Sequence, residues 1–158
     1  MATVYIETSI IGYLTARSRS DVIFQARQEL TRSWWDSSRE DYELVTSQLV
    51  LDEAAAGDAD AAAERLQLLI GIPILASADA QVDSLADALL SAHLIPEKAR
   101  SDAEHMAIAT VHRVDYLLTW NCKHIANAAT LPAVYRLLTD SGYTPPLIVT
   151  PEEFSGYD

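Results

Sequence analysis

The segment Thr3-Val4-Tyr5-Ile6-Glu7-Thr8-Ser9 joins an apolar run directly to a carboxylate. Residues 3–6 are β-branched or aromatic, which is typical of a buried strand, and a helical run follows from Ile10 to Ala16. Glu7 therefore falls at the carboxyl end of the predicted strand. Functional sites of parallel α/β sheets lie beyond these strand ends, so Glu7 is the first candidate site residue.

The same alternation of strand and helix continues along the chain. Further strands are predicted at 43–46, 72–75, 115–119 and 147–149, and further helices at 21–38, 47–56, 58–69, 82–93, 101–112 and 130–141. The strands are continuously apolar, as in a parallel sheet that is covered on both faces. We therefore expect the α/β class, with a mainly parallel central sheet.

Single residues indicate where several helices and strands begin or end, and which side of a helix faces the core. Ser47 is placed to cap the helix that Gly57 terminates, and Ser101 with Glu104 forms a capping-box pattern. Pro73 places the strand at 72–75 near an edge of the sheet. In the helix at 21–38, the apolar spacing predicts an inner face formed by Ile23, Ala26, Leu30 and Trp34.

Length and composition narrow the class of protein. The 158 residues suit one domain, expected to span residues 1–158. No window approaches the roughly 18 apolar residues of a membrane span, and the N-terminus lacks a basic signal-peptide start. We therefore expect a soluble, cytoplasmic protein without a membrane partner. The one cysteine, Cys122, excludes an internal disulfide and a multi-thiolate zinc site.

Acidic residues outnumber basic ones by 23 to 11, which gives a net charge of −12. A protein that is held on nucleic acid mainly by phosphate contacts tends to be basic. The charge therefore argues against a protein that coats DNA or RNA without preference.

Three more polar side chains fall where elements join. Glu53 and Asp102 lie on the stripes of their helices that should face the sheet, and Asn121 follows the strand at 115–119. Asp102 also has a structural explanation, because an acid in the first helical turn is stabilised by the macrodipole. If the acids meet in one pocket, their oxygen donors favour Mg²⁺ or Mn²⁺ over zinc.

Hydroxyl groups and a histidine stand beside these acids. Thr8, Ser9 and Thr119 are placed either to orient the carboxylates by hydrogen bonds or to form turns, and both roles remain open. His105 lies three residues after Asp102, and we interpret it as a hydrogen-bonded packing residue rather than a metal ligand.

Four segments together resemble the PIN-domain nucleases, and more closely their toxin branch, the VapC-type ribonucleases of bacterial toxin–antitoxin pairs. The resemblance covers nearly the whole chain and rests on the order and spacing of Tyr5–Ser9, Ser47 with Glu53 and Gly57, Asp102–Ala109 and Asp115–His124. It implies a three-layer α/β/α PIN-like domain that hydrolyses RNA with Mg²⁺ or Mn²⁺. It also implies an antitoxin protein as partner and a homodimer.

By this resemblance Glu7, Glu53 and Asp102 bind the metal, and Asn121 occupies a more variable fourth acidic position. If Thr8, Ser9 and Thr119 orient the carboxylates rather than form turns, they hydrogen-bond these metal-binding acids. Two residues depart from the family pattern: Glu7 stands where Asp is commoner, and Asn121 is neutral, which weakens a second metal site.

Two other functions are compatible with an acidic edge of an α/β sheet. The first is a catalytically inactive PIN-fold binding module, which the departures at Glu7 and Asn121 and the surplus negative charge favour. The second is a receiver-like phosphoacceptor domain, which needs an aspartate nucleophile at a strand end. Here Ser47 holds the central position, and this argues against a phosphoacceptor.

Overall fold

Parallel strands form the sheet of the computed structural model, which describes residues 1–155. The last three residues of the expected domain therefore lie outside the described residues. The order is β3-β2-β1-β4-β5, and every neighbouring pair runs parallel. The strands are β1 (Thr3–Ile6), β2 (Glu43–Ser47), β3 (Ile74–Leu75), β4 (Tyr116–Leu118) and β5 (Leu147–Val149). This topology confirms the predicted α/β class.

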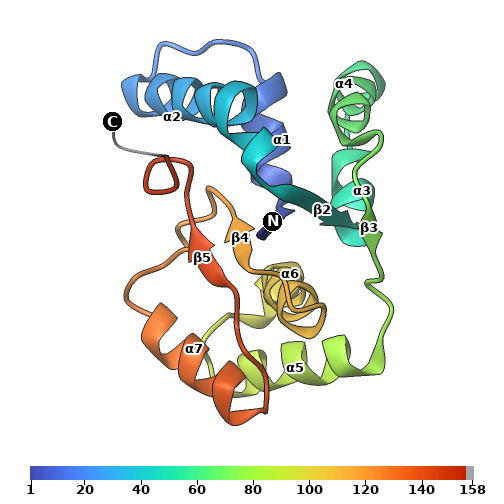
Figure 1. Cartoon of the computed structure of the whole chain (residues 1–158), viewed down its shortest axis with the longest axis vertical. Helices are drawn as coiled ribbons and strands as arrows, with labels where there is room; N and C mark the ends of the chain where they lie inside the picture. The colour runs from blue at the N-terminus through green and yellow to red at the C-terminus, as the bar shows by residue number, and fades with distance from the viewer. Residues whose placement is uncertain (156–158) are drawn as a thin grey trace.

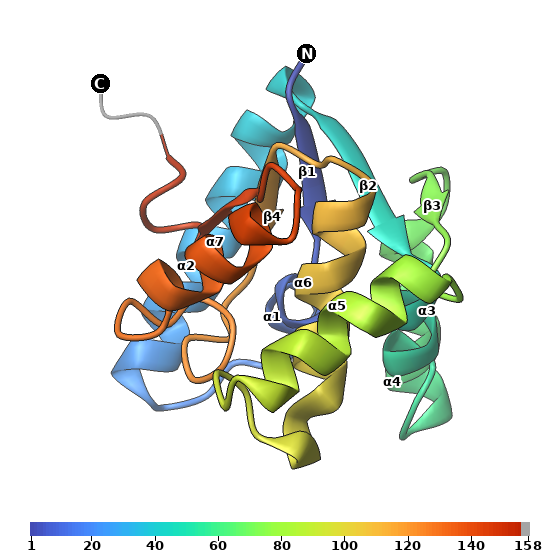
Figure 2. The ribbon, with the colours of Figure 1, turned by 90° about the horizontal axis from the view of Figure 1, so that it is seen from below.

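Helices cover the sheet on both faces, as Figures 1 and 2 show. One group comprises α1 (Thr8–Thr15), α2 (Val22–Ser33), α3 (Gln48–Ala54) and α4 (Ala59–Leu69). The other comprises α5 (Ala80–Ser91), α6 (Arg100–Val111) and α7 (Leu131–Asp140). The expected three-layer α/β/α arrangement is confirmed. Among the described residues, no helix has the length and apolar composition needed to cross a bilayer.

The central strand β1 aligns the strand ends that build the site. Its residues Val4, Tyr5 and Ile6 are completely buried. Tyr5 pairs in register with Val45 of β2, and Ile6 pairs with Leu118 of β4. Because the three strands are parallel and in register, the residues that follow or end them meet at one edge of the sheet. Glu7, Ser47 and Thr119 are these residues.

Some predicted boundaries are confirmed and one is wrong. The hydroxyl of Ser47 accepts the N–H of Val50 at 3.2 Å, as expected of a cap for α3. The predicted capping box at Ser101 does not form, because α6 already begins at Arg100, directly after a 3₁₀ turn at Glu97–Ala99. Glu104 instead pairs with Arg100 at 3.1 Å.

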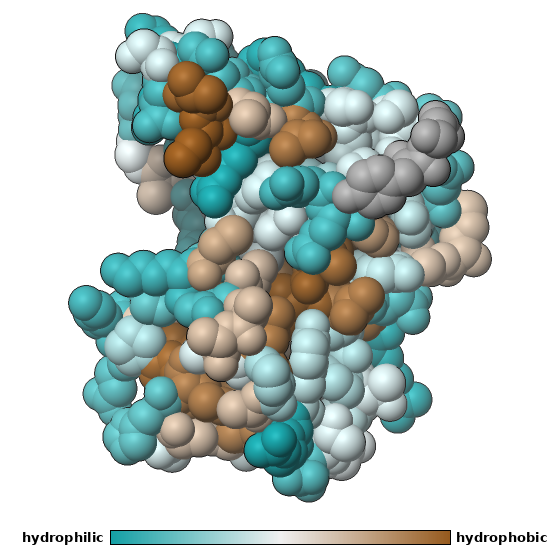
Figure 3. All heavy atoms as spheres, turned by 90° about the vertical axis from the view of Figure 1, so that its left-hand side faces the viewer, coloured by the Kyte–Doolittle hydropathy of each residue, from teal (hydrophilic) through white to brown (hydrophobic). Residues whose placement is uncertain are grey.

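The predicted helix at 21–38 is divided, and its inner face is only partly as expected. A π-helix over Trp34–Ser38 continues α2, and Trp34 is buried as predicted. Ile23 is 68% exposed, next to Val22 at 77%, because the first turn of α2 extends past the sheet (Figure 1). Figure 3 shows apolar surface at this end of α2.

The strand predicted at 72–75 is shorter than expected but lies where Pro73 indicated. Only Ile74–Leu75 pair with β2, and β3 forms one edge of the sheet. Pro73 has no N–H, but its carbonyl oxygen still accepts the N–H of Thr46 at 2.9 Å.

Truncating the core beneath the site should lower stability sharply. Leu117 of β4 is completely buried, so Leu117→Ala should lower the free energy of unfolding by about 2–5 kcal/mol. The matched control is Leu147→Ala on β5, where the side chain is 54% exposed, and there the loss should stay below about 1 kcal/mol. Urea unfolding followed by circular dichroism measures both. Equal losses would contradict the assignment of β4 to the core.

Candidate functional site

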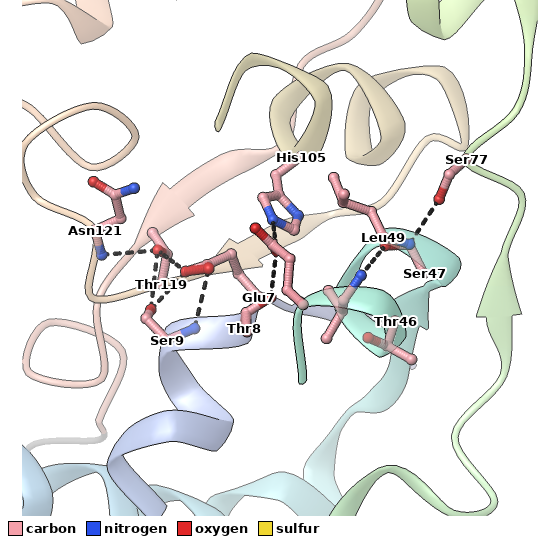
Figure 4. Close-up of polar contacts among 12 residues, drawn as sticks. Glu7, Thr8, Ser9, Thr46, Ser47, Leu49, Ser77, His105, Thr119 and Asn121 are labelled. Carbon is pink, nitrogen blue, oxygen red and sulfur yellow. Dashed lines mark hydrogen bonds and ion pairs between the residues drawn. The ribbon is translucent and has the colours of Figure 1, made fainter. Parts of the chain in front are cut away.

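Glu7 is buried at the junction of β1 and α1, and hydrogen bonds hold both of its carboxylate oxygens. Its side chain is the N-cap of α1: Oε2 accepts the Ser9 N–H at 3.0 Å. Oε1 accepts the hydroxyls of Ser9 at 2.5 Å and Thr119 at 2.6 Å. Figure 4 shows Ser9 and Thr119 grouped at this carboxylate. These three hydrogen bonds fix the orientation of the Glu7 carboxylate, and only 5% of the residue is exposed.

Glu53 reaches the same region from α3 and is held through one oxygen only. Oε1 accepts the hydroxyl of Thr8 at 2.7 Å and faces Nε2 of His105 at 2.5 Å. Oε2 has no hydrogen-bond partner among the described residues. Burial alone would raise the pKa of Glu53, but the hydrogen bond and charge of His105, with Thr8, lower it below its usual value. Glu53 is therefore ionised, with one oxygen available.

His105 links Glu53 to the centre of the sheet through a buried hydrogen-bond chain. Its Nδ1 lies 2.7 Å from the Tyr5 hydroxyl, which lies 2.7 Å from Oγ of Ser47. The tyrosine and serine hydroxyls can each donate or accept, so the chain is satisfied whether His105 is neutral or protonated. The Ser47–Tyr5–His105–Glu53 chain thus connects β2, β1, α6 and α3.

Asp102 lies one turn before His105 on α6 and is half-buried. Neither of its carboxylate oxygens has a hydrogen-bond partner among residues 1–155. Burial alone would lower the pKa of His105, but the bond to Glu53 and the charges of Glu7, Glu53 and Asp102 raise it overall. The charges of the three predicted acids therefore all act on one imidazole, and Glu53 alone is hydrogen-bonded to it.

Asn121 stands beyond Thr119 at the edge of this group (Figure 4). Its N–H donates to the Thr119 hydroxyl at 2.9 Å, and its Oδ1 accepts the N–H of His124 at 3.0 Å. The side-chain oxygen of Asn121 thus closes the turn that follows β4.

Comparison with solved structures places this architecture among known folds. A chain of VapC20 from Mycobacterium tuberculosis, a toxin that cleaves the sarcin–ricin loop, aligns with TM-score 0.58 and 16% identity over 89% of this chain and 95% of its own. The chain has the VapC-type PIN-domain fold.

Two further structures with the VapC fold come from toxin–antitoxin complexes. VapBC-1 of nontypeable Haemophilus influenzae aligns with TM-score 0.54 and 14% identity, over 95% of this chain and 98% of its own. VapBC2 of Rickettsia felis, bound to a promoter DNA fragment, gives TM-score 0.52 and 14% identity, over 94% and 98%. Neither family models nor curated proteins match the sequence.

The donor set at the edge of the VapC fold suits a hard cation held by few side chains. Among residues 1–155, no three His, Cys, Asp or Glu side chains are arranged to hold a metal ion together. Mg²⁺, however, usually binds one or two carboxylates and completes its shell with water and substrate phosphate. Asp102 and Oε2 of Glu53 are unengaged carboxylate oxygens of this type, and Oε2 of Glu7 accepts one hydrogen bond only, which leaves it a further acceptor position.

Sequence reasoning missed the role of Tyr5, which was assigned only to a buried strand. A tyrosine hydroxyl on a fully buried strand needs a hydrogen-bond partner. This requirement is the sequence signal from which a buried polar chain below the site could have been predicted. His105 lies as expected in one respect, since it is 1% exposed and hydrogen-bonded through both ring nitrogens.

Removing the Tyr5 hydroxyl should destabilise the protein, because Nδ1 of His105 and Oγ of Ser47 both lose a buried partner. Tyr5→Phe should cost about 1–3 kcal/mol in thermal or urea unfolding. The control is Tyr42→Phe, a half-buried ring whose hydroxyl makes no hydrogen bond within the described residues. If both variants unfold alike, the buried chain does not contribute to stability.

The stability of the metal-free protein should fall as pH rises above the normal range of histidine. The folded-state pKa of His105 is raised above 6.5, so the protonated histidine stabilises the folded protein. This contribution to the free energy of unfolding is fully present below pH 6.5 and is lost as the pH rises through the folded-state pKa. Glu53→Gln should lower the His105 midpoint in an NMR titration in EDTA and flatten the pH dependence of unfolding. An unchanged midpoint would contradict the coupling.

Proposed function

We propose that this chain is a metal-dependent endoribonuclease that hydrolyses RNA phosphodiester bonds, with residues 1–158 as one PIN-like nuclease domain. One arrangement supports the proposal: at the carboxyl ends of the strands, Glu53 is hydrogen-bonded to His105, Asp102 lies one turn before His105 on α6, and Glu7 directly follows β1. VapC20, which shares this fold at 16% identity, is a toxin that cleaves the sarcin–ricin loop.

The acids of this site differ in how many hydrogen bonds their carboxylates accept, and this difference suggests separate roles. Asp102, Glu53 through Oε2 and Glu7 through Oε2 would bind Mg²⁺ or Mn²⁺, and Glu7 is the most firmly held of the three acids. Such a cation supplies an activated water and neutralises charge on a phosphodiester. Thr8, Ser9 and Thr119 orient the carboxylates through the hydrogen bonds described above. Asn121 assists through the cation or a water.

We also propose the biological setting of a type II toxin–antitoxin pair. VapBC-1 and VapBC2 are toxin–antitoxin structures with the same fold, and this supports an antitoxin protein as partner. As part of this proposal, the protein forms a homodimer and is located in the cytoplasm.

A catalytically inactive PIN-fold binding module is the second candidate. Two observations favour it: Asn121 is neutral with its Oδ1 committed to His124, and no three acidic or imidazole side chains of residues 1–155 are placed to hold a metal. Such a module would share the fold and RNA contacts but not hydrolysis.

Cleavage of a mixed single-stranded RNA pool in Mg²⁺, Mn²⁺ or EDTA tests the nuclease. We expect metal-dependent cutting by the wild type and a loss in Asp102→Asn of at least about 100-fold, the upper range for disturbing a metal's supporting groups. The control is Asp52→Asn, an exposed acid that accepts a hydrogen bond from Gln48 and should leave cutting unchanged.

The thermal midpoint with and without Mn²⁺ separates the two candidates. Saturating Mn²⁺ should stabilise the wild type by about 2.7 kcal/mol at 100 times Kd and should not stabilise Asp102→Asn. A wild type that binds Mn²⁺ and RNA but never cuts would replace the nuclease by the binding module.

A further inference from the structure

Three aromatic rings form a continuous strip that begins at the acidic site. Trp120 lies between Thr119 and Asn121, and its backbone N–H donates to the Ser9 hydroxyl that binds Glu7. Its ring centroid lies 5.9 Å from that of Tyr13 on α1, and Tyr13 lies 4.9 Å from Phe24 on α2. The strip therefore runs from the carboxylates onto the first turns of α2.

Two guanidinium groups lie on the faces of this strip. Arg27 stands over Trp120 at 5.0 Å and Arg19 over Phe24 at 4.5 Å. Such cation–π contacts hold an arginine side chain in place while the edge of its guanidinium stays available for hydrogen bonds. Trp120 itself is only 5% exposed, so the strip presents cations rather than an open tryptophan face for base stacking.

Arg19 and Arg27 differ from the other basic residues in their position, because the rings that they stand on lead to Trp120, next to Thr119. Neither has a carboxylate within 4 Å among residues 1–155, whereas Arg100 pairs with both Asp87 and Glu104. Arg65 is also engaged, donating to the carbonyl oxygens of Ala54 and Ala56. Guanidiniums without a carboxylate partner that lie beside an acidic site have the chemistry to bind a phosphate chain.

We propose that Arg19 and Arg27 bind backbone phosphates of single-stranded RNA and lead the strand past Glu7 and Asp102. This inference rests on the proposed function, since it names where that site's substrate lies. The two cations counter the local repulsion between RNA and a protein of net charge −12. They contact phosphates, so the strip binds the strand without reading its sequence.

Binding of a fluorescein-labelled single-stranded RNA, followed by anisotropy in fixed Mg²⁺ over a series of salt concentrations, tests the strip. The parent protein carries Asp102→Asn so that the RNA stays intact. Arg27→Met and Arg19→Met keep much of the apolar stem and remove the charge. Each should weaken binding by roughly fivefold at 0.1 M salt and reduce the salt slope by about 0.7, the value for one lost phosphate contact on single strands.

The matched control is Arg136→Met, an exposed arginine on α7 in the opposite helix layer. It loses the same charge and should bind RNA like the parent. Equal losses in all three variants, or no binding of RNA by the parent, would overturn the proposal. Arg19 is exposed in the loop before α2, so its substitution tests the strip even if Arg27→Met fails to fold.

The same variants distinguish this proposal from the nuclease proposal. In the cleaving wild type, Arg27→Met should raise KM and leave kcat unchanged. If no variant cuts RNA but the two strip variants alone bind it weakly, the proposal for the strip is supported and the nuclease proposal is contradicted. If cutting is metal-dependent and neither arginine substitution changes KM, the nuclease proposal is supported and the proposal for the strip is contradicted.

Discussion

The buried hydrogen-bond chain from Ser47 through Tyr5 and His105 to Glu53 holds the carboxyl ends of the central strands to the helices around them. It joins two strands and two helices that are distant in sequence, with every contact between 2.5 and 2.7 Å. A polar group at such depth is costly unless it is paired, so each member constrains the position of the next. A slip of β1 by one residue would turn Tyr5 away and leave Nδ1 of His105 without a partner.

This chain also explains how three carboxylates coexist at one edge. Glu7 is buried and satisfied by hydroxyl and N–H donors, Glu53 is ionised beside His105, and Asp102 remains open. A single imidazole offsets only part of their negative charge. The unengaged oxygens of Glu53 and Asp102 would be the strongest attraction for a small divalent cation, because no hydrogen bond to residues 1–155 offsets their charge.

The strands and the acids at their ends could be predicted from sequence because both follow from local patterns. Glu7 directly follows an apolar run, and β5 at Leu147–Val149 has the predicted bounds. The hydrogen-bond chain could not be predicted, because Tyr5 and His105 are 100 residues apart and meet only through the sheet order. Ser101 misled for a related reason: its capping pattern is correct locally, but the preceding 3₁₀ turn starts α6 earlier.

The acidity of the chain and an RNA substrate are compatible because charge acts locally. Within a Debye length of about 8 Å at physiological salt, a phosphate responds to its nearest neighbours more than to the net charge of −12. Arg27 and Arg19 stand on rings that begin one residue from Thr119, so cations border the acids on the α2 side. Net charge would then oppose binding of nucleic acid elsewhere on the surface, and binding would be confined to the one edge where cations and carboxylates meet.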